Sequence, residues 1–401
     1  MKKILFTIKF FLKLRINFNL KSNPDYLILD DVGSEKLNNI LNNSRLILPI
    51  RFFDNTKVIF INYEIIKYFF QYYFLKKQKP FTSYLLSTIK FINPKVVVTF
   101  IDNSLKFGDL AKILHKKYPF IAVQQCARYD FKRHRYEYRK KIRKENLLKK
   151  FFIPNLLCFG KYEKDDYKKY GIKVKKFFEV GSLSLANAYF YFKKQNIKIK
   201  KNKYDFCVAS DDGIGLNETY QRNDLERRYC LTTKYTIQYC MKFKKKFVFA
   251  WKRELKEYID KEYSYYKKHL SESEFKYLLK NSVYRSRKKF SSYRAILESN
   301  VVVGVATTML REKLASGGKI LSCNFTNLNV YDFPINNFFS MKKNNYSLFE
   351  KKIQLVSKMS DKEFNKRLGN KKNYLVSATD AKNINLIKNK IKYIKLNHNS
   401  V

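Results

Sequence analysis

Short apolar runs that end in polar residues recur along the 401-residue chain, and they constrain its fold more than any other feature. Two examples are "NPKVVVTFIDN" and "YDFCVASDDG", in which an apolar run ends in acidic or amide residues. Segments of helical length, such as "SYLLSTIKFI" and "LKFGDLAKILHKKY", separate such runs. Because strands that alternate with helices form parallel sheets with right-handed crossovers, the pattern predicts an α/β protein.

The alternation occurs on both sides of a Lys-rich stretch, which predicts two Rossmann-like, doubly wound domains that face a central cleft. In such sheets ligands bind at the carboxyl ends of the strands. The predicted segments are a basic lead-in at 1–24, an N-terminal domain at 25–193, a linker at 194–203, a C-terminal domain at 204–345 and a helical tail at 346–401.

The lead-in is not typical of a signal peptide, because Lys9, Lys13 and Arg15 interrupt its apolar residues. An interfacial amphipathic helix and a strand-forming segment both fit it.

The formal net charge of +49 favours an anionic partner such as a nucleotide, a nucleic acid or a membrane surface. Lys, Asn, Ile, Phe and Tyr are all abundant, so compositional drift accounts for much of this charge, and it is no evidence for nucleic acid by itself. The six cysteines form no CxxC pair, which predicts a reducing, cytoplasmic compartment without a disulfide framework. The four histidines are scattered, which leaves little material for a His-based metal site.

Polar residues follow the apolar run in "VVVGVATTMLREKLASGGKILSCN", from Val301 to Asn324. The free N–H groups and dipole of a helix that begins here favour an anion such as phosphate, and Thr307 and Thr308 add hydroxyl groups. Arg311 and Glu312 lie one turn further on, where a carboxylate suits sugar hydroxyls. The alternative is a plain helix cap followed by a solvated Arg-Glu pair.

Three acids near other strand ends are candidate catalytic residues: Asp102, Asp211 and Asp130. A carboxylate at a strand end can take the proton of a substrate hydroxyl or act as the nucleophile. A helix N-cap is the alternative for Asp102, and Asp211 competes with its neighbour Asp212.

Lys252 and Arg253 follow the run "FVFAW" and are suited to neutralise a phosphate leaving group. A surface charge pair is the alternative for them. Asp165 and Asp166 lie in a Lys-rich helical segment and are expected to be solvated. No DxD motif between apolar strands appears, so no metal is predicted, and the absence of GxxxxGK[ST] excludes a P-loop ATPase.

Five segments together resemble the bacterial surface-carbohydrate biosynthesis proteins of capsule and lipopolysaccharide assembly, which are GT-B-like glycosyltransferases distantly similar to Kdo transferases. They are "VVVTFIDNSLKFGDLAKI", "FIAVQQCARYD", "CFGKYEKDDYKKYGI", "VGSL" and "SSYRAILESNVVVGVATTMLREKLASGGKILSCNFTN…YDFP". The resemblance runs from about Asp25 to Tyr374. Cys126 stands where a glycine is expected in relatives, which puts a close backbone approach to the acceptor in doubt.

The resemblance implies a GT-B fold with an N-terminal acceptor domain and a C-terminal nucleotide-sugar domain. It implies a nucleotide-sugar donor, with a CMP-sugar as one option, a glycan or lipid-linked acceptor, and no metal or other cofactor. On this interpretation Lys252, Arg253, Thr307, Thr308, Arg311 and Glu312 bind the donor. The expected acceptor-binding residues are Asn103, Gln125 and Arg128.

The basic run at 131–150 holds ten Lys and Arg against two Glu. It favours peripheral contact with the anionic inner membrane or a polyanionic glycan, and a solvated loop is the alternative. The predicted function is thus a metal-independent glycosyltransferase of surface polysaccharide or lipopolysaccharide, cytoplasmic or peripheral on the inner membrane. The alternative is a nucleic-acid-binding or catalytically inactive GT-B-like protein, although no nucleic-acid-binding motif emerges.

Overall fold

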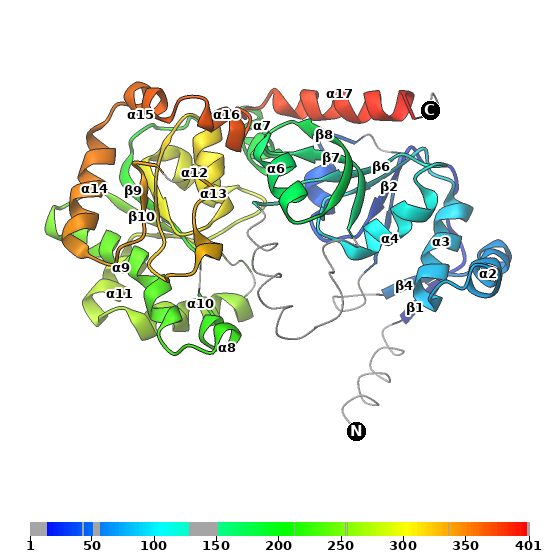
Figure 1. The fold of residues 1–401 in the computed structure, drawn as a ribbon, viewed down its shortest axis with the longest axis horizontal. Helices are drawn as coiled ribbons and strands as arrows, with labels where there is room; N and C mark the ends of the chain where they lie inside the picture. Colours follow the sequence, from blue (N-terminus) through cyan, green and yellow to red (C-terminus); the bar gives the residue numbers. More distant parts are fainter. Residues whose placement is uncertain are drawn as a thin grey trace.

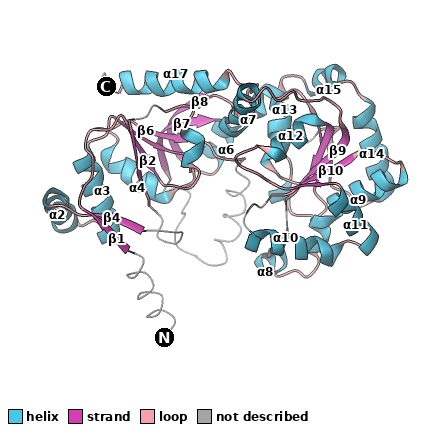
Figure 2. Cartoon of the chain, turned by 180° about the vertical axis from the view of Figure 1, so that it is seen from behind, coloured by secondary structure: helices cyan, strands magenta, loops and turns pink. Residues whose placement is uncertain are grey.

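Two six-stranded parallel sheets form the framework of the chain (Figure 1). The computed structural model describes residues 14–41, 44–50, 57–127, 151–211, 213–252, 254, 256–335 and 337–398. Helices cover both faces of each sheet, as Figure 2 shows from behind. The prediction of two doubly wound α/β domains is therefore confirmed.

The first sheet has the strand order β3-β2-β5-β6-β7-β8, and all of its neighbouring strands are parallel. We call this sheet and the helices on it the N-domain. Its strands are β2 (Tyr26–Leu29), β3 (Arg45–Leu48), β5 (Val96–Thr99), β6 (Phe120–Val123), β7 (Phe152–Cys158) and β8 (Lys173–Glu179). Its helices are η1 (Ser34–Leu37), α2 (Tyr63–Phe70), η2 (Gln71–Leu75), α3 (Pro80–Ile92), α4 (Leu105–Leu114), α6 (Tyr162–Lys169) and α7 (Leu183–Lys194).

The second sheet has the order β11-β10-β9-β12-β13-β14, again with parallel pairs throughout. We call it, with its helices, the C-domain. Its strands are β9 (Tyr204–Ala209), β10 (Phe247–Ala250), β11 (Ser282–Val283), β12 (Ser299–Gly304), β13 (Lys319–Cys323) and β14 (Ser340–Met341). Its helices include α8 (Leu216–Tyr220), α9 (Leu225–Lys242), α10 (Lys256–His269), α11 (Glu272–Lys280), α12 (Ser291–Glu298), α13 (Thr308–Ala315), α14 (Tyr346–Lys358), α15 (Asp361–Leu368) and α16 (Lys371–Leu375).

The apolar runs of the sequence become the central strands because both faces of these strands are buried. Val96, Val97 and Val98 of β5 and Val301 to Val303 of β12 are all inaccessible to solvent. Strands of a parallel sheet covered on both sides carry continuous apolar runs, which is why they are visible in the sequence. Ser360 caps α15 as expected, since its hydroxyl accepts a hydrogen bond from Glu363 N at 3.1 Å.

The last helix, α17 (Asn383–Leu396), returns to the N-domain (Figure 1). Ile384, Ile387, Ile391 and Ile394, spaced along one face of α17, pack into the core formed by β2, β5 and α7. The chain thus crosses between the domains twice, once after α7 and once after α16.

The predicted linker at 194–203 corresponds to the segment between the end of α7 and the start of β9. In the predicted lead-in at 1–24, the structure describes residues from 14 onward. There β1 (Leu14–Asn17) pairs in parallel with β4 (Lys57–Phe60), outside both large sheets.

Candidate functional site

The carboxyl edges of the two sheets meet at the junction of the domains. The backbone N–H of Ala127, beyond the end of β6, donates to Thr308 Oγ1 at the start of α13 over 3.0 Å. Ser182, beyond the end of β8, donates its hydroxyl hydrogen to Glu312 Oε1 over 2.5 Å. All strands of one sheet are parallel, so the polar residues at their carboxyl ends lie along one edge of the sheet. The two contacts described above place the carboxyl edges of the two sheets face to face. This is the position in which open α/β sheets bind ligands.

Thr307 and Thr308 occupy the turn between β12 and α13. Thr307 is the N-cap of α13, and its hydroxyl accepts a hydrogen bond from Met309 N at 3.4 Å. The local sequence favours a helix start here because a Thr oxygen can satisfy a backbone N–H that lacks an intrahelical partner. Both threonines are partly exposed at this edge.

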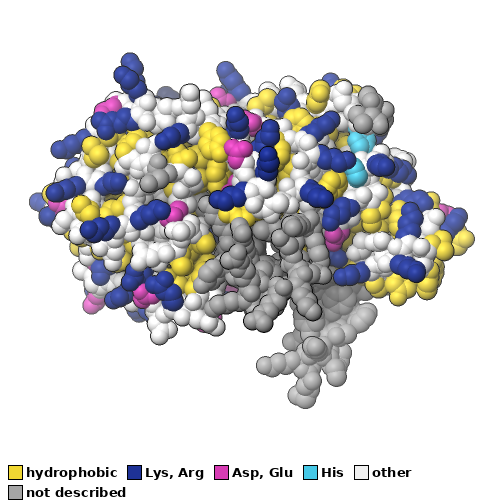
Figure 3. Space-filling view, in the orientation of Figure 1, with side chains coloured by type: hydrophobic (Ala, Val, Ile, Leu, Met, Phe, Trp, Pro, Cys, Tyr) yellow, Lys and Arg dark blue, Asp and Glu magenta, His cyan; other side chains and the backbone are white. Residues whose placement is uncertain are grey.

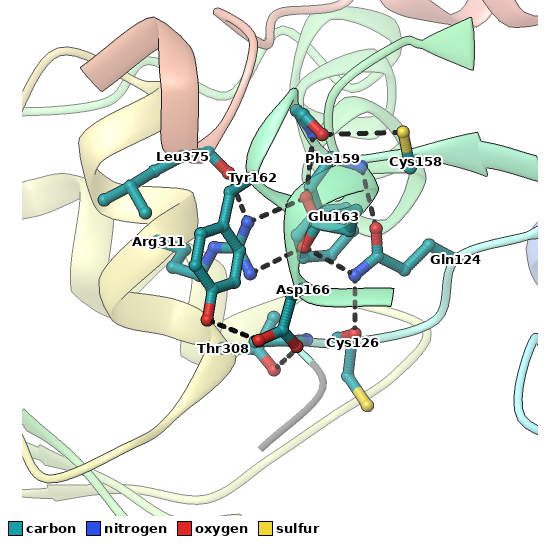
Figure 4. Close-up of polar contacts among 12 residues, drawn as sticks. Gln124, Cys126, Cys158, Phe159, Tyr162, Glu163, Asp166, Thr308, Arg311 and Leu375 are labelled. Atoms are coloured by element: carbon teal, nitrogen blue, oxygen red, sulfur yellow. Dashed lines mark hydrogen bonds and ion pairs between the residues drawn. The ribbon is translucent and has the colours of Figure 1, made fainter. Parts of the chain in front are cut away.

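Arg311 crosses from α13 into the N-domain, where it pairs with Glu163 of α6 (Figure 4). Its Nη1 lies 2.7 Å from Glu163 Oε1 and its Nη2 lies 3.1 Å from Oε2, which makes the pair bidentate. Nη2 also donates to the carbonyl of Leu375, and the rings of Phe159 and Tyr162 lie 5.4 and 5.3 Å from the guanidinium carbon. Both charged side chains are almost fully buried.

Gln124, at the end of β6, extends this network within the N-domain (Figure 4). Its amide nitrogen donates to Glu163 Oε1 at 3.1 Å and to the carbonyl of Cys126 at 3.0 Å, and its oxygen accepts from Phe159 N at 2.8 Å. The loops after β6 and β7 are therefore held together by the carboxylate that pairs with Arg311. The network fixes how the two sheet edges face each other.

Glu312 is buried at the same junction and accepts hydrogen bonds from Ser182 and from Tyr293 OH, the latter at 3.0 Å. Burial raises the pKa of its carboxyl, while these two hydrogen bonds and the charges of Lys36 and Arg285 act in the opposite direction. The alternative of a solvated Arg-Glu pair is therefore wrong, because both Arg311 and Glu312 are only 1% exposed.

Lys36, in η1 of the N-domain, lies beside this carboxylate. Its ammonium donates to Ser184 Oγ at 3.0 Å and lies 5.1 Å from the centre of the Phe100 ring. Burial, followed by the nearby Arg285 charge, lowers the pKa of Lys36, whereas Glu312 opposes this effect. The loop before η1 depends on Gly33, whose φ of +76° is costly for any residue with a side chain.

A cavity of about 150 Å³ opens between the domains at this point. It has room for about five waters at their liquid volume, or for a small anionic group. Its lining comes from η1 and α7 on one side and from the segment between β11 and α13 on the other. The charged residues of the lining are Lys36, Arg285, Arg287, Lys288 and Glu35. We call this the basic interdomain pocket.

Lys252 and Asp211 follow two neighbouring strands, β10 and β9, and pair with each other. Lys252 Nζ lies 3.1 Å from Asp211 Oδ1, and Tyr229 OH donates to Asp211 Oδ2 at 2.6 Å. Arg285 donates to the carbonyl of Lys252 at 2.7 Å, which connects this pair to the basic interdomain pocket. The Asp211 side chain remains 18% exposed.

Asp102, in contrast, is only 1% exposed. Its Oδ1 accepts from the backbone N–H of Gln125 at 3.0 Å, and its Oδ2 accepts from Tyr167 OH at 2.8 Å. These bonds join the end of β5 to the loop after β6. Asn103 and Gln125 are both partly exposed at this edge of the N-domain, as an acceptor-binding role requires. That role and the catalytic role of Asp102 stay predictions.

Four residues named in the sequence analysis, together with the basic run, lie outside the described residues: Asp130, Arg128, Asp212, Arg253 and the run at 131–150. Asp166, expected to be solvated, is buried, and it accepts a hydrogen bond from Tyr162 OH at 3.0 Å. Asp166 is buried because the side of the Lys-rich helix α6 that carries it faces the domain junction.

Sequence reasoning missed Glu163, Ser182, Lys36, Arg285 and Tyr293. Glu163 and Ser182 follow predicted strands within a few residues, so the strand-end argument would have found them if extended to "CFGKYEKDD" and "VGSL". Arg285 follows β11, a two-residue strand too short to be visible in the sequence.

Within the described residues, no group of three or more His, Cys, Asp or Glu is arranged to hold a metal ion. None of the six cysteines forms a disulfide bond, and all but Cys126 are buried.

Comparisons with known proteins give matches only among solved structures. No family model matches the sequence, and no curated protein matches it. The UDP-GlcNAc 2-epimerase from Neisseria meningitidis is 11% identical, with a TM-score of 0.48 over 92% of this chain and 99% of that one. The wall teichoic acid polymerase TagF is 11% identical, with a TM-score of 0.48 over 94% of this chain and 90% of the other. The UDP-forming α,α-trehalose-phosphate synthase from Burkholderia vietnamiensis is 8% identical, with a TM-score of 0.45 over 95% and 98% of the two chains. At these identities and TM-scores the likenesses settle neither the family nor the activity of this chain.

Proposed function

We propose that the protein is a glycosyltransferase that binds a nucleotide-sugar between its two domains and transfers the sugar to a glycan or lipid-linked acceptor of the cell surface. The observation that carries the proposal is the basic interdomain pocket. There Lys36 of the N-domain and Arg285 of the C-domain converge where the carboxyl edges of two parallel sheets meet. The proposal also draws on the family resemblance of the sequence.

A phosphate group is the anion that best suits the pocket, because four cations and one carboxylate line it and it is too small for a whole nucleotide. In glycosyl transfer, the oxygen of the acceptor hydroxyl attacks the anomeric carbon, and the bond from that carbon to the phosphate oxygen breaks. Negative charge then develops on the phosphate. Fixed cations lower the barrier by stabilising this charge without a metal ion.

A carboxylate must take the proton of the acceptor hydroxyl if the transfer occurs in one step. Asp211 is our first choice for this role, because solvent reaches its side chain at the edge of the C-domain sheet. Asp102 is the second choice, since only 1% of it is exposed to solvent. Thr307, Thr308 and Lys252 are proposed donor-binding residues, whereas Arg311 and Glu312 would act by holding the two domains in register.

Calorimetric titration with UDP, CMP, CDP, GDP and dTDP tests this function, with a short single-stranded RNA as the control ligand. We expect one nucleotide to bind at physiological salt and Arg285→Gln to weaken that binding. Release of the nucleotide from its sugar conjugate, measured by mass spectrometry with and without EDTA, then tests transfer and metal independence. If no nucleotide binds and RNA binds in a salt-sensitive way, the transferase proposal is wrong and the nucleic-acid alternative replaces it.

A further inference from the structure

The helix formed by α2 and η2 exposes an unusual number of apolar side chains. Six of the twenty large apolar side chains that are exposed in the described residues lie within these thirteen positions. Exposed apolar residues are ordinary when scattered, but a gathering of this kind marks an interaction surface. We call the six the α2 stripe: Tyr63, Ile66, Phe70, Tyr73, Phe74 and Leu75.

The α2 stripe is not the face that holds the helix on the domain. Ile65 and Tyr72 make that contact, and both are buried in the N-domain core. The six side chains of the stripe are 37–77% exposed, whereas Ile65 and Tyr72 are only 3% and 5% exposed. The side of a surface helix that faces away from the core is normally polar. Here the described part of the chain covers only one side, so the other side suits a partner outside the chain.

The charges beside the stripe indicate the chemistry of that partner. Residues 63–79 contain four lysines and a single acidic residue, Glu64. All four lysines are exposed: Lys67, Lys76, Lys77 and Lys79. A lysine near an anionic bilayer surface favours binding, and its long stem lets the charge reach the headgroups while the aliphatic part lies on apolar surface.

The aromatic composition of the stripe points in the same direction. Seven of the seventeen residues at 63–79 are Phe or Tyr, and Phe70 stacks on Phe74 with 5.7 Å between ring centres. Aromatic rings with lysines beside them are characteristic of helices that lie at the boundary between headgroups and acyl chains. No helix among the described residues is long and apolar enough to cross a membrane.

The place of α2 in the fold also suits contact with a bilayer. Both ribbon views place α2 at the end of the molecule, far from the junction of the domains (Figures 1 and 2). In the space-filling view, hydrophobic and basic side chains gather at this end of the molecule (Figure 3).

We infer that α2 and η2 form a docking surface for an anionic lipid bilayer. The helix lies in the plane of the membrane, with Phe70, Phe74 and Leu75 between the headgroups and the acyl chains and with the four lysines against the phosphates. This inference rests on different residues from the proposed transferase site, so either can fail without the other.

Flotation of the full chain with vesicles tests it. The wild-type protein should float with vesicles of phosphatidylcholine mixed with phosphatidylglycerol, and only weakly with phosphatidylcholine alone. F70S/F74S/L75S should lower the affinity for the mixed vesicles at least tenfold. Transfer of large apolar side chains from water favours insertion, so loss of three is ample for a tenfold change. The matched control is L348S/L355S/L386S, which removes three exposed leucines from α14 and α17 and should bind as the wild type does.

A fluorescence experiment reports insertion directly. The single native tryptophan, Trp251, is buried in the C-domain core and supplies a constant background. Phe74→Trp should shift its emission to the blue with mixed vesicles and be quenched by brominated acyl chains. Tyr258→Trp, at an exposed position of α10, should show neither change.

Three outcomes overturn the inference. The first is that the wild-type protein binds neither kind of vesicle. The second is that F70S/F74S/L75S binds as well as the wild type, or that the leucine control loses binding equally. The third is that Phe74→Trp remains unquenched while the protein floats, which means that charge alone holds the protein or that the stripe serves a protein partner.

Discussion

Arg311 of α13 and Glu163 of α6 form a bidentate ion pair across the domain junction, with N–O distances of 2.7 and 3.1 Å and at most 2% of either side chain exposed. A buried pair of this kind contributes little net stability, because both charges have lost their hydration. Removal of one partner is costly, however, since the other charge is left buried without compensation. The pair therefore acts mainly on how the two domains fit together.

Arg311→Met should lower the free energy of unfolding by about 3–5 kcal/mol, the cost of an uncompensated buried carboxylate. The double variant E163Q/R311M should recover part of this loss. Urea unfolding followed by Trp251 fluorescence and circular dichroism measures both. The control is Arg367→Met, since the Arg367–Glu363 pair is about half exposed on both sides and its loss should cost less than about 1 kcal/mol. An effect of Arg311→Met no larger than that of the control would contradict this role.

The pairing of Arg311 with Glu163 could not be predicted from the sequence. A run such as "VVVGV" predicts a buried strand by itself, because its consecutive apolar residues cover both faces of the strand. Arg311 and Glu163 lie 148 positions apart, and each sits in a segment rich in charges that also suits a solvated helix surface. Only the packing of one sheet edge on the other shows that they meet.

The position of α17 could not be predicted from the sequence for a similar reason. Its isoleucines show helical spacing, which predicts one apolar face, but nothing in the spacing says which domain that face covers. The strand ends were more informative. They pointed to Thr307, Thr308 and Glu312, whose donor-binding role stays a prediction, whereas the cations of the basic interdomain pocket come from a short 3-10 helix and from the segment after a two-residue strand.

Arg285→Gln should weaken binding of the preferred nucleotide by about 1–3 kcal/mol, the scale of a lost charge-assisted hydrogen bond. The side chain lines the basic interdomain pocket and also holds the carbonyl of Lys252. Arg222→Gln is the control, because Arg222 does not line the pocket and pairs with Asp224. Calorimetry measures the dissociation constants, and equal affinity in both variants would remove Arg285 from the site.

Gly33→Ala should destabilise the protein by about 1–2 kcal/mol for its left-handed backbone and by about 1–3 kcal/mol more for a steric clash. The added Cβ would lie 2.7 Å from Phe100 Cδ1. Gly215 provides a matched comparison, because its φ is +77° but an added Cβ would meet nothing within 4 Å. Thermal unfolding of G33A and G215A therefore separates the two effects. Nucleotide affinity should fall only in G33A, since Lys36 lies over the Phe100 ring.

Lys313 should make stability depend on pH in the alkaline range. Its ammonium is buried against the carbonyls of Ile296 and Ser299, at 2.9 and 2.7 Å, and burial lowers its pKa from 10.5 to about 8. Between about pH 8 and 10.5 the unfolded chain binds more protons at this group than the folded chain, so stability rises with pH across that window. Below about pH 8 both states are protonated and the contribution is constant.

Lys313→Met should flatten this rise by an amount on the order of 1–3 kcal/mol. Urea unfolding of the wild type and of Lys313→Met at several values between pH 7.5 and 10.5 measures the free energy of unfolding of each. The titration of all other groups cancels in the difference between the two proteins. Lys358→Met, at the end of α14, is the control and should leave the slope unchanged. Parallel curves for the wild type and Lys313→Met would show that Lys313 keeps its ordinary pKa.

Asp211 and Asp102 can be separated by the kind of loss that each substitution causes. Asp211→Asn should lower turnover of the nucleotide-sugar at least 100-fold, the usual size of a general-base contribution, with little change in nucleotide affinity. Asp102→Asn should act mainly on stability, by about 1–3 kcal/mol, because its carboxylate holds Gln125 N and Tyr167 OH in the interior.

Tyr167→Phe sharpens the comparison, because it removes one bond to Asp102 and leaves the carboxylate in place. If Asp102 is structural, Tyr167→Phe and Asp102→Asn should both lower the melting temperature and keep the turnover of the folded fraction. If Asp102 is instead the base, Asp102→Asn will abolish turnover. Tyr167→Phe will then retain turnover in the folded fraction, because the carboxylate of Asp102 stays in place. That pattern, together with an active Asp211→Asn variant, would move the catalytic role from the C-domain edge to the N-domain edge.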